Sequence, residues 1–201
     1  MSIYGEHEQA LIRVMERTAA YIEGCGDRYA REHGEKLYEH LSWRLKSDES
    51  MREKLRRKGL EETKENALFR IQDAIGLRVV CLFIDDVYET ARLIREMPGT
   101  TVVEEKDYIR EAKPNGYRSY HLILDVSGCF EDGEKPEGRC CAEIQLRTIA
   151  MDTWAALEHE LKYKKDIENQ ELIVQELRRC ANELTACDVS MQTLRRIIRQ
   201  S

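Results

Sequence analysis

Residues 113–121, with the sequence Lys-Pro-Asn-Gly-Tyr-Arg-Ser-Tyr-His, join a tight turn to side chains that suit the binding of a nucleotide. Pro114 fixes φ, and the Asn-Gly pair after it tolerates the left-handed angles that a reversal needs. Beyond the turn, strand alternation predicts one shared face for Tyr117, Ser119 and His121. That face would offer a ring for stacking on a base, a hydroxyl and an imidazole. The segment alone fits both a nucleotide site and an ordinary hairpin.

Two carboxylates stand where a sheet could bring them together. Asp73 lies just ahead of an apolar run that predicts a buried strand, and Glu143 lies on the polar face of a later strand. Neighbouring strands of a mixed sheet would carry both to one Mg²⁺, because this cation prefers a few carboxylates together with substrate phosphates. The alternative is that both carboxylates belong to a solvated strand face.

A basic segment lies between Arg44 and Lys58, where seven basic residues stand against three acidic ones. Within it Lys46, Ser50 and Lys54 recur every four residues and therefore share one face of a predicted helix. Such a row of donors suits the oxygens of phosphate groups. Amphipathic helices produce the same spacing by default, so the row alone does not decide between the two interpretations.

The composition is that of a globular protein rich in solvated helix: 201 residues, 42% hydrophobic and 35% charged, which fits one domain. No apolar run approaches the ~20 residues that span a bilayer, and the N-terminus lacks the pattern of a signal peptide, so we expect a cytoplasmic protein. The net charge of −6 argues against a protein that coats nucleic acid, although a cleft can still be basic. The seven cysteines include no Cys-x-x-Cys pair, and we expect them to be reduced.

Hydrophobic spacing and capping residues predict the order of the elements. Ser47 is placed to cap a helix that Gly59 ends, and the glycines at 24 and 26 are placed to end the first helix. Helices are expected at 6–22, 34–42, 47–58, 62–75, 85–97, 149–164 and from about 167 to the end. Strands are expected at 77–83, 100–109, 117–126 and 139–148.

Four blocks in this order resemble the synthetase domain of the RelA/SpoT superfamily, and specifically its small alarmone synthetases. They are Arg44-x-Lys46-x-x-x-Ser50-x-x-x-Lys54, Asp73-Ala74-Ile75-Gly76-Leu77-Arg78-Val79, the 113–121 segment, and Glu143-Ile144-Gln145-Leu146-Arg147-Thr148. The resemblance implies an α/β (α+β) fold of the nucleotidyltransferase type, with a mixed sheet of about five strands flanked by helices. It divides the chain into an N-terminal helical segment (1–42), a synthetase core (43–165) and a C-terminal helical extension (166–201).

The resemblance implies a GTP pyrophosphokinase, which moves the β,γ-pyrophosphate of ATP to the 3′-hydroxyl of GDP or GTP and releases AMP. Asp73 and Glu143 match the Mg²⁺ carboxylates of the family, and Glu143 also matches the group that takes the hydroxyl proton. The residues that match the ATP site are Arg44 and Arg78 on the adenine, with Lys46, Ser50, Lys54 and Arg57 on the phosphates. The residues that match the acceptor site are Lys113, Asn115, Tyr117, Ser119, His121, Gln145, Asp152 and Glu158.

Small departures from the family pattern leave the acceptor open. Tyr120 stands where Leu is usual, and Asp152 stands where some relatives carry Asn near the guanine, so the choice between GDP and GTP is not fixed. The chain has no His-Asp dipeptide of the kind found in the family's hydrolase domain, and its length leaves no room for that domain or for regulatory ones. We therefore expect synthesis of the alarmone and not its hydrolysis.

The last expectations concern how the protein assembles and which other functions it could have. The resemblance implies a homotetramer built through terminal helices, with pppGpp as an allosteric ligand between subunits. The apolar residues of the C-terminal helix suit that role, although the helix could instead pack back on its own sheet: Leu172, Ile173, Leu177, Leu184, Val189, Leu194 and Ile197. The rival functions are a different nucleotidyltransferase, and an inactive nucleotide-binding or RNA-binding module of the same fold.

Overall fold

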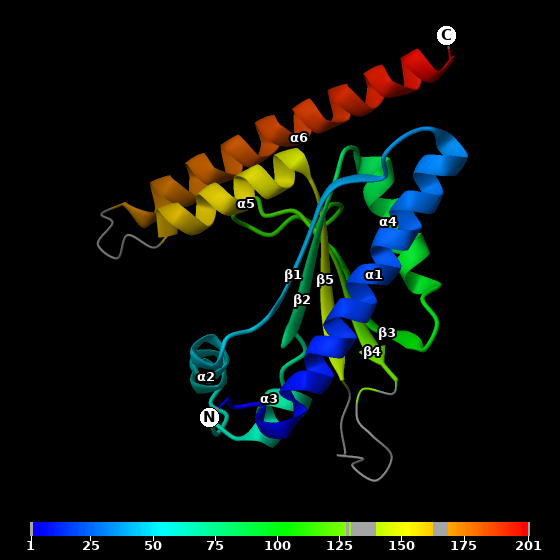
Figure 1. Cartoon of the computed structure of the whole chain (residues 1–201). Coiled ribbons are helices and arrows are strands. Elements are labelled where there is room, and N and C mark those ends of the chain that lie inside the picture. Colours follow the sequence, from blue (N-terminus) through cyan, green and yellow to red (C-terminus); the bar gives the residue numbers. More distant parts are fainter. Residues whose placement is uncertain (1, 128, 130–139, 163–168, 201) are drawn as a thin grey trace.

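A computed structural model describes residues 2–127, 129, 140–162 and 169–200 of the chain (Figure 1). Within these residues one sheet has five strands in the order β1-β2-β5-β4-β3. Strands β2 and β5 are parallel, and the other neighbouring pairs are antiparallel. The strands are β1 (Tyr38–Leu45), β2 (Ile75–Cys81), β3 (Thr100–Asp107), β4 (Tyr120–Val126) and β5 (Cys141–Thr148). The expected mixed sheet of about five strands is confirmed.

Helices cover the sheet unevenly, as Figure 1 shows. Helices α1 and α4 lie along one face, whereas α2 and α3 lie at one end of the molecule and α5 and α6 at the other. The helices are η1 (Gly5–His7), α1 (Glu8–His33), α2 (Asp48–Arg57), α3 (Lys64–Phe69), α4 (Ile84–Arg95), α5 (Ile149–Lys162) and α6 (Gln170–Gln200). None of these described helices is long and apolar enough to cross a membrane.

The core lies between the sheet and the α1–α4 layer. On β5, Ala142, Ile144 and Leu146 are fully buried in it, whereas Glu143 and Gln145 face the other way and are half-buried. The alternation predicted for this strand is therefore confirmed. No helix covers the middle of the opposite face, as Figure 1 shows, so the polar side chains there do not pack against a helix.

Helix α1 is longer than predicted, since it continues through both glycines to His33 and ends at Gly34, whose φ is 71°. Gly26 stays in the helix for a packing reason. A Cβ at that position would lie 2.7 Å from the ring of Tyr38 on β1, so the absence of a side chain lets the strand approach the helix. Gly26, which was expected to end the helix, instead allows the helix to pack closely on β1.

The predicted helix over residues 34–42 is wrong, because Tyr38–Leu45 forms the edge strand β1. Its residues pair with β2 in an antiparallel ladder that includes Trp43 with Leu77 and Arg44 with Gly76. A short apolar and aromatic run fits either element, and here the partner strand decides. Both edge strands are also irregular, with register shifts between Tyr38 and His40 on β1 and between Val102 and Glu104 on β3.

Helix α2 agrees with its sequence signals. The Ser47 side chain accepts a hydrogen bond from the backbone N–H of Ser50 at 3.3 Å, and Gly59 follows the helix with φ of 68°. Helix α3 is shorter than the predicted 62–75. Strand β4 begins at Tyr120, so Tyr117 and Ser119 precede the ladder that was predicted to contain them.

The cysteines were expected to be reduced, and the structure corrects this for one pair. Cys129 and Cys140 form a disulfide, with their Cα atoms 6.2 Å apart. They follow β4 and precede β5, and antiparallel pairing of these strands brings the two residues together. The remaining five cysteines, all in the described part of the chain, form no disulfide, and Cys180 and Cys187 are exposed on α6.

Candidate nucleotide site

The uncovered face of the sheet carries the predicted residues in two rows that follow from strand register. In one row Arg44 of β1 pairs with Gly76 of β2, which pairs with Glu143 of β5. The neighbouring row consists of Ser42, Arg78, Gln145 and His121. Residues paired directly across strands share a face, so register alone brings residues of all four sequence blocks together.

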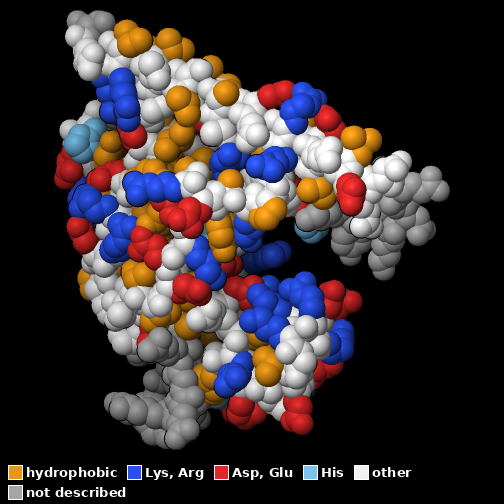
Figure 2. Space-filling view, turned by 180° about the vertical axis from the view of Figure 1, so that it is seen from behind, with side chains coloured by type: hydrophobic (Ala, Val, Ile, Leu, Met, Phe, Trp, Pro, Cys, Tyr) orange, Lys and Arg blue, Asp and Glu red, His pale blue; other side chains and the backbone are white. Residues whose placement is uncertain are grey.

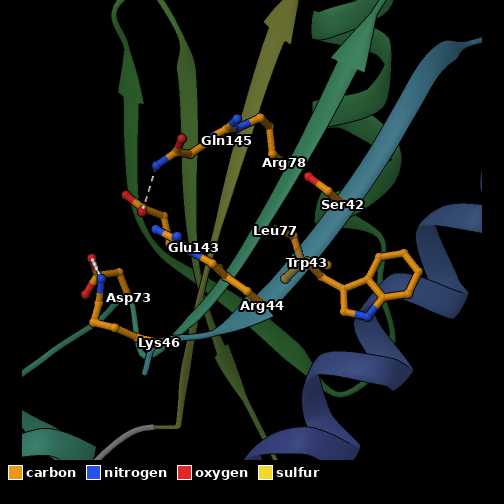
Figure 3. A pocket seen from close by; sticks show the side chains of 10 residues that line it. Ser42, Trp43, Arg44, Lys46, Asp73, Leu77, Arg78, Glu143 and Gln145 are labelled. Atoms are coloured by element: carbon orange, nitrogen blue, oxygen red, sulfur yellow. Dashed lines mark hydrogen bonds and ion pairs between the residues drawn. The ribbon is translucent and has the colours of Figure 1, made fainter. Parts of the chain in front are cut away.

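A pocket of about 320 Å³ opens on this face (Figure 3). Six of its lining residues belong to the predicted site: Arg44, Lys46, Asp73, Arg78, Glu143 and Gln145. Four others complete the wall: Ser42, Trp43, Gly76 and Leu77. Gly76 matters because it stands between the Arg44 and Glu143 positions and has no side chain, which leaves the floor of the pocket open.

Basic side chains gather on the α2 side of the pocket. In the space-filling view the face is hollowed between the lobe that holds α2 and the arm of α5 and α6, with Lys and Arg side chains along the α2 lip (Figure 2). Lys46 Nζ lies 3.3 Å from Asp73 Oδ2, and Lys54 forms an ion pair with the same oxygen. Ser50 and Arg57, also predicted for the donor phosphates, are exposed on α2. A cluster of this kind suits the oxygens of a polyphosphate.

The donor set at Asp73 and Glu143 fits a hard divalent cation. The Oδ1 atom of Asp73 is buried without a hydrogen-bond partner, although Oδ2 receives both lysines. A buried, unsatisfied carboxylate oxygen is rare and costly, which is expected where a cation belongs. No group of three or more His, Cys, Asp or Glu side chains suited to a metal occurs in the described parts of the chain. The set therefore suits a divalent cation whose remaining ligands would be substrate phosphates.

Glu143 is held ionised by its neighbours. Burial raises the pKa of this carboxyl, but hydrogen bonds from His121 and Gln145 and the charge of Lys54 outweigh burial and lower the pKa to about 2. His121 Nδ1 lies 3.1 Å from Oε1, and Gln145 Nε2 donates to Oε2 at 3.0 Å. Glu143 is therefore a full negative charge at neutral pH.

Tyr117 and His121 meet, as predicted, on the β4 side of the site. The Tyr117 hydroxyl lies 2.9 Å from His121 Nε2, and the two rings are nearly perpendicular, at 80°. Ser119, predicted for the same face, is fully buried and its hydroxyl donates to the Leu146 carbonyl at 3.2 Å. The structure therefore brings Tyr117 and His121 together, whereas the side chain of Ser119 is buried and does not join them.

Arg147 connects several polar side chains of this region by hydrogen bonds, and no role was predicted for it. It is 5% exposed, and it donates at 2.9 Å to the Tyr117 hydroxyl, to Gln145 Oε1 and to Asp152 Oδ1. Its guanidinium also lies 5.3 Å from the centre of the Tyr117 ring. Strand alternation puts Arg147 on the same face of β5 as Glu143, but alternation does not show which residues it contacts.

The remaining predicted acceptor residues surround Tyr117. Asn115 donates to Glu158 at 3.1 Å and also accepts from the Tyr117 N–H at 3.2 Å. Lys113 Nζ lies 4.9 Å from the centre of the Tyr117 ring and 4.5 Å from that of Tyr108, a residue that was not predicted. Asp152 links the two sides of the site, because Arg78 Nη1 lies 3.4 Å from its Oδ1.

Comparison with known proteins identifies the family of this chain. Residues 43–168 match the region found in RelA/SpoT proteins. The chain is 40% identical over 149 residues to GTP pyrophosphokinase YwaC of Bacillus subtilis, which covers 74% of this chain and 70% of that protein. Both proteins therefore share most of their length.

Two solved structures of small alarmone synthetase 1 from Bacillus subtilis have the same fold. The form bound to its product pppGpp has a TM-score of 0.82 and 32% identity, over 94% of this chain and 95% of that one. The form bound to AMPCPP has a TM-score of 0.74 and 29% identity, over 96% and 95%. With the matched region spanning most of the chain, the protein belongs to the family that contains the RelA/SpoT region.

Proposed function

We propose that this protein is a (p)ppGpp synthetase that transfers the β,γ-pyrophosphate of ATP to the 3′-hydroxyl of GDP or GTP. The acceptor oxygen forms a bond to the β-phosphorus while the bond from that phosphorus to the AMP oxygen breaks, so AMP and ppGpp or pppGpp result. The observation that carries this proposal is the position of Glu143. It lines the donor pocket with Asp73 and is hydrogen-bonded to His121 of the acceptor side.

The pocket is assigned to ATP. Arg44 and Arg78 are exposed at its wall, where planar guanidinium groups can stack on both faces of adenine. Lys46 and Lys54 stand beside Asp73 and supply positive charge for the triphosphate, with Ser50 and Arg57 further along α2. The relative bound to AMPCPP supports an adenine nucleotide as donor.

The acceptor is assigned to the Tyr117 side. The Tyr117 ring would stack on guanine, and His121 would contact an acceptor phosphate, with Lys113, Asn115, Gln145, Asp152 and Glu158 around them. Ser119 would contribute only indirectly to acceptor binding, because its hydroxyl is hydrogen-bonded to the backbone of β5. The relative whose product is pppGpp supports a guanine nucleotide as the acceptor.

Asp73 and Glu143 are the residues that would hold Mg²⁺, which when bound neutralises phosphate charge and favours in-line transfer. The side chains of this protein supply positioning and the path of the proton. Glu143 is proposed to take the hydroxyl proton. Its low pKa keeps it ionised for that step, and polyphosphate beside it would raise its proton affinity.

The proposal includes a homotetramer assembled through helical faces, located in the cytoplasm with its nucleotide substrates. Part of α6 packs on α5, since Leu177 of α6 is buried against Trp154 of α5. Other apolar side chains are about half exposed or more: Leu172, Val189, Met191, Leu194, Ile197 and Ile198. A second copy packed on this face of α6 would bury these side chains. A pppGpp site between subunits belongs to the same proposal.

Light scattering tests the assembly. We expect the mass of four chains at micromolar concentration, because the exposed apolar residues of α6 favour burial. Leu194→Asp should lower the mass, whereas Leu194→Met, which keeps an apolar side chain at the same position, is the matched control. A wild-type monomer at this concentration contradicts the tetramer.

Nucleotide chromatography tests the reaction. The protein is incubated with ATP and Mg²⁺ together with GMP, GDP or GTP in turn. We expect AMP in equal amount to a new guanine nucleotide, and the acceptor that gives the highest kcat/KM is the preferred one. Formation of ADP in place of AMP would indicate transfer of a single phosphoryl group and would overturn the proposal.

A further inference from the structure

The turn that carries Tyr117 packs directly on the C-terminal helix. Gly116 has φ of 93°, and a Cβ there would lie 2.6 Å from Ala181 Cβ and 3.0 Å from Arg178 Cα. A Cβ at 2.6 Å from another carbon is essentially never seen, and the positive φ also favours glycine, so this contact depends on Gly116. The backbone of the turn therefore packs closely on the Ala181 side chain and on the Arg178 backbone of α6.

A second contact lies one residue beyond Tyr117. Arg118 donates from Nη2 to Asn182 Oδ1 at 3.2 Å and from Nη1 to the Gly116 carbonyl at 3.2 Å. The space that remains between the turn and helices α5 and α6 is about 10 Å³, close to the lower limit for one water molecule. Neither surface can move toward the other, and a larger side chain on α6 must push the turn away.

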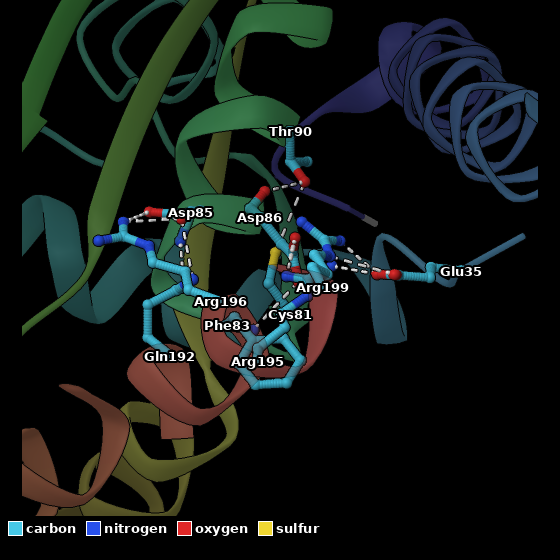
Figure 4. Close-up of polar contacts among 10 residues, drawn as sticks. All are labelled: Glu35, Cys81, Phe83, Asp85, Asp86, Thr90, Gln192, Arg195, Arg196 and Arg199. Atoms are coloured by element: carbon cyan, nitrogen blue, oxygen red, sulfur yellow. Dashed lines mark hydrogen bonds and ion pairs between the residues drawn. The ribbon is translucent and has the colours of Figure 1, made fainter. Parts of the chain in front are cut away.

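The far half of the same helix is fixed to another part of the core (Figure 4). Arg195 donates to Asp86 and to Glu35, each at 2.6 Å, and its guanidinium lies 4.3 Å from the centre of the Phe83 ring. Arg195 and Asp86 are 8% and 2% exposed. Breaking a buried ion pair of this kind is strongly unfavourable, so α6 has a fixed position relative to α4.

We propose that α6 is a positioning element of the acceptor site: its Arg178–Asn182 segment sets where Tyr117 lies, and a displacement of α6 is transmitted to acceptor binding and not to ATP binding. This inference rests on the proposed function for the identity of the acceptor. Its physical basis is the glycine contact, which couples the turn to the helix, together with the anchor at Arg195, which holds the helix. The ATP pocket is formed by β1, β2, β5 and the Asp73 segment and includes no residue of α6.

Ala181→Leu tests the proposal, with Ala186→Leu on the exposed side of the same helix as the matched control. The KM for acceptor and for ATP are measured for each, together with hydrogen exchange of a peptide that contains residues 113–117. Ala181→Leu should raise the acceptor KM about tenfold or more while the ATP KM stays within about twofold. Exchange in the turn should quicken, because the Gly116 N–H to Lys113 O bond of 2.8 Å is disturbed. Ala186→Leu should match wild type.

Asn182→Ala is the second variant, since its side chain is exposed and its loss leaves the fold intact. It removes the partner of Arg118 and should give a smaller rise, about threefold, in the acceptor KM alone. A folded variant of either kind with an unchanged acceptor KM, or with both constants raised equally, overturns the proposal; if Ala181→Leu does not fold, Asn182→Ala decides. A wild type that makes no product refutes the proposed function only, because exchange in the turn still reports whether α6 holds it.

Discussion

The side of the site proposed for ATP and the side proposed for the acceptor differ in what their polar side chains contact. On the ATP side Arg44 and Arg78 are exposed around an open pocket, and the buried contacts concentrate on Asp73. On the acceptor side the polar groups bond one another. One chain of hydrogen bonds joins Glu143, His121, Tyr117, Arg147 and Asp152.

This difference has an energetic meaning. A donor nucleotide enters an existing pocket and gains contacts with few losses. An acceptor must compete with internal hydrogen bonds, each worth about 0.5–1.5 kcal/mol net. The same hydrogen bonds hold the Tyr117 ring in one orientation, which favours the specificity of acceptor binding over its affinity. The two sides meet at Glu143, so changes there should affect both.

The largest effect is expected at the shared carboxylates. Asp73→Asn and Glu143→Gln keep the side-chain shape but remove the charge that would hold Mg²⁺, and each should lower kcat by about 10³-fold or more. AMP release measures the rate, and circular dichroism confirms that the variants fold. Comparable turnover in either folded variant contradicts the metal assignment.

Gly76→Val should block the ATP side alone. Its side chain would fill the floor of the pocket between the Arg44 and Glu143 positions, and the ATP KM should rise about tenfold to a hundredfold. Gly76→Ala is the matched control, because the nearest atom to an added Cβ is the Arg44 carbonyl oxygen at 4.0 Å. Initial rates at varied ATP measure the effect. An equal rise in the acceptor KM would mean that the two sides are not separate.

Tyr117→Ala and Arg44→Ala should damage different constants. Stacking on a base is worth roughly 1–3 kcal/mol, so Tyr117→Ala should raise the acceptor KM about tenfold and leave the ATP KM nearly unchanged. Arg44→Ala should do the reverse, because it loses contact with adenine.

Tyr117→Phe separates the ring from its hydroxyl and serves as the control. It keeps the stacking surface and removes the bonds to His121 and Arg147. The acceptor KM should then change less than in Tyr117→Ala. If Tyr117→Ala weakens ATP and spares the acceptor, the two nucleotides lie the other way across the sheet.

The smallest effect concerns acid stability. The pKa of Glu143 is lowered from 4.5 to about 2, so the unfolded chain binds more protons between these values. Stability from this group is therefore present above pH 4.5 and is lost as pH falls through 2, at most about 3 kcal/mol. His121→Ala removes the main hydrogen bond and should flatten this dependence. Denaturant unfolding from pH 2 to 6 measures it, with exposed His40→Ala as control; equal slopes contradict the role of His121.

The parts of the fold that sequence could predict are those set by local chemistry. The Ser47 cap, the Gly59 stop and the alternation of β5 depend on residues close in the chain, and all three are confirmed. Strand β1 was missed because its conformation depends on pairing with β2, and Gly26 was misinterpreted because its role depends on Tyr38. Both depend on partners distant in sequence.

The same distinction between local signals and distant partners applies to the site. The carboxylates and basic residues proposed for the ATP side could be predicted to lie together because each motif is contiguous and strand register brings the motifs to one pocket. Arg147 was missed because its role exists only in contacts with Tyr117 and Asp152, which come from other elements. Ser119 was misplaced because β4 begins at Tyr120, so strand alternation does not apply to it.

The irregular edges of the sheet bear on how copies of this chain can associate. An open edge strand exposes backbone groups on which a strand of another molecule could add, leading to aggregation. Here both edges resist strand addition: β1 and β3 each contain a register shift, and β3 carries the charged run Glu104-Glu105-Lys106-Asp107. Growth into fibrils by edge pairing is thereby disfavoured, which leaves the helical surfaces as the route to a closed assembly of defined size.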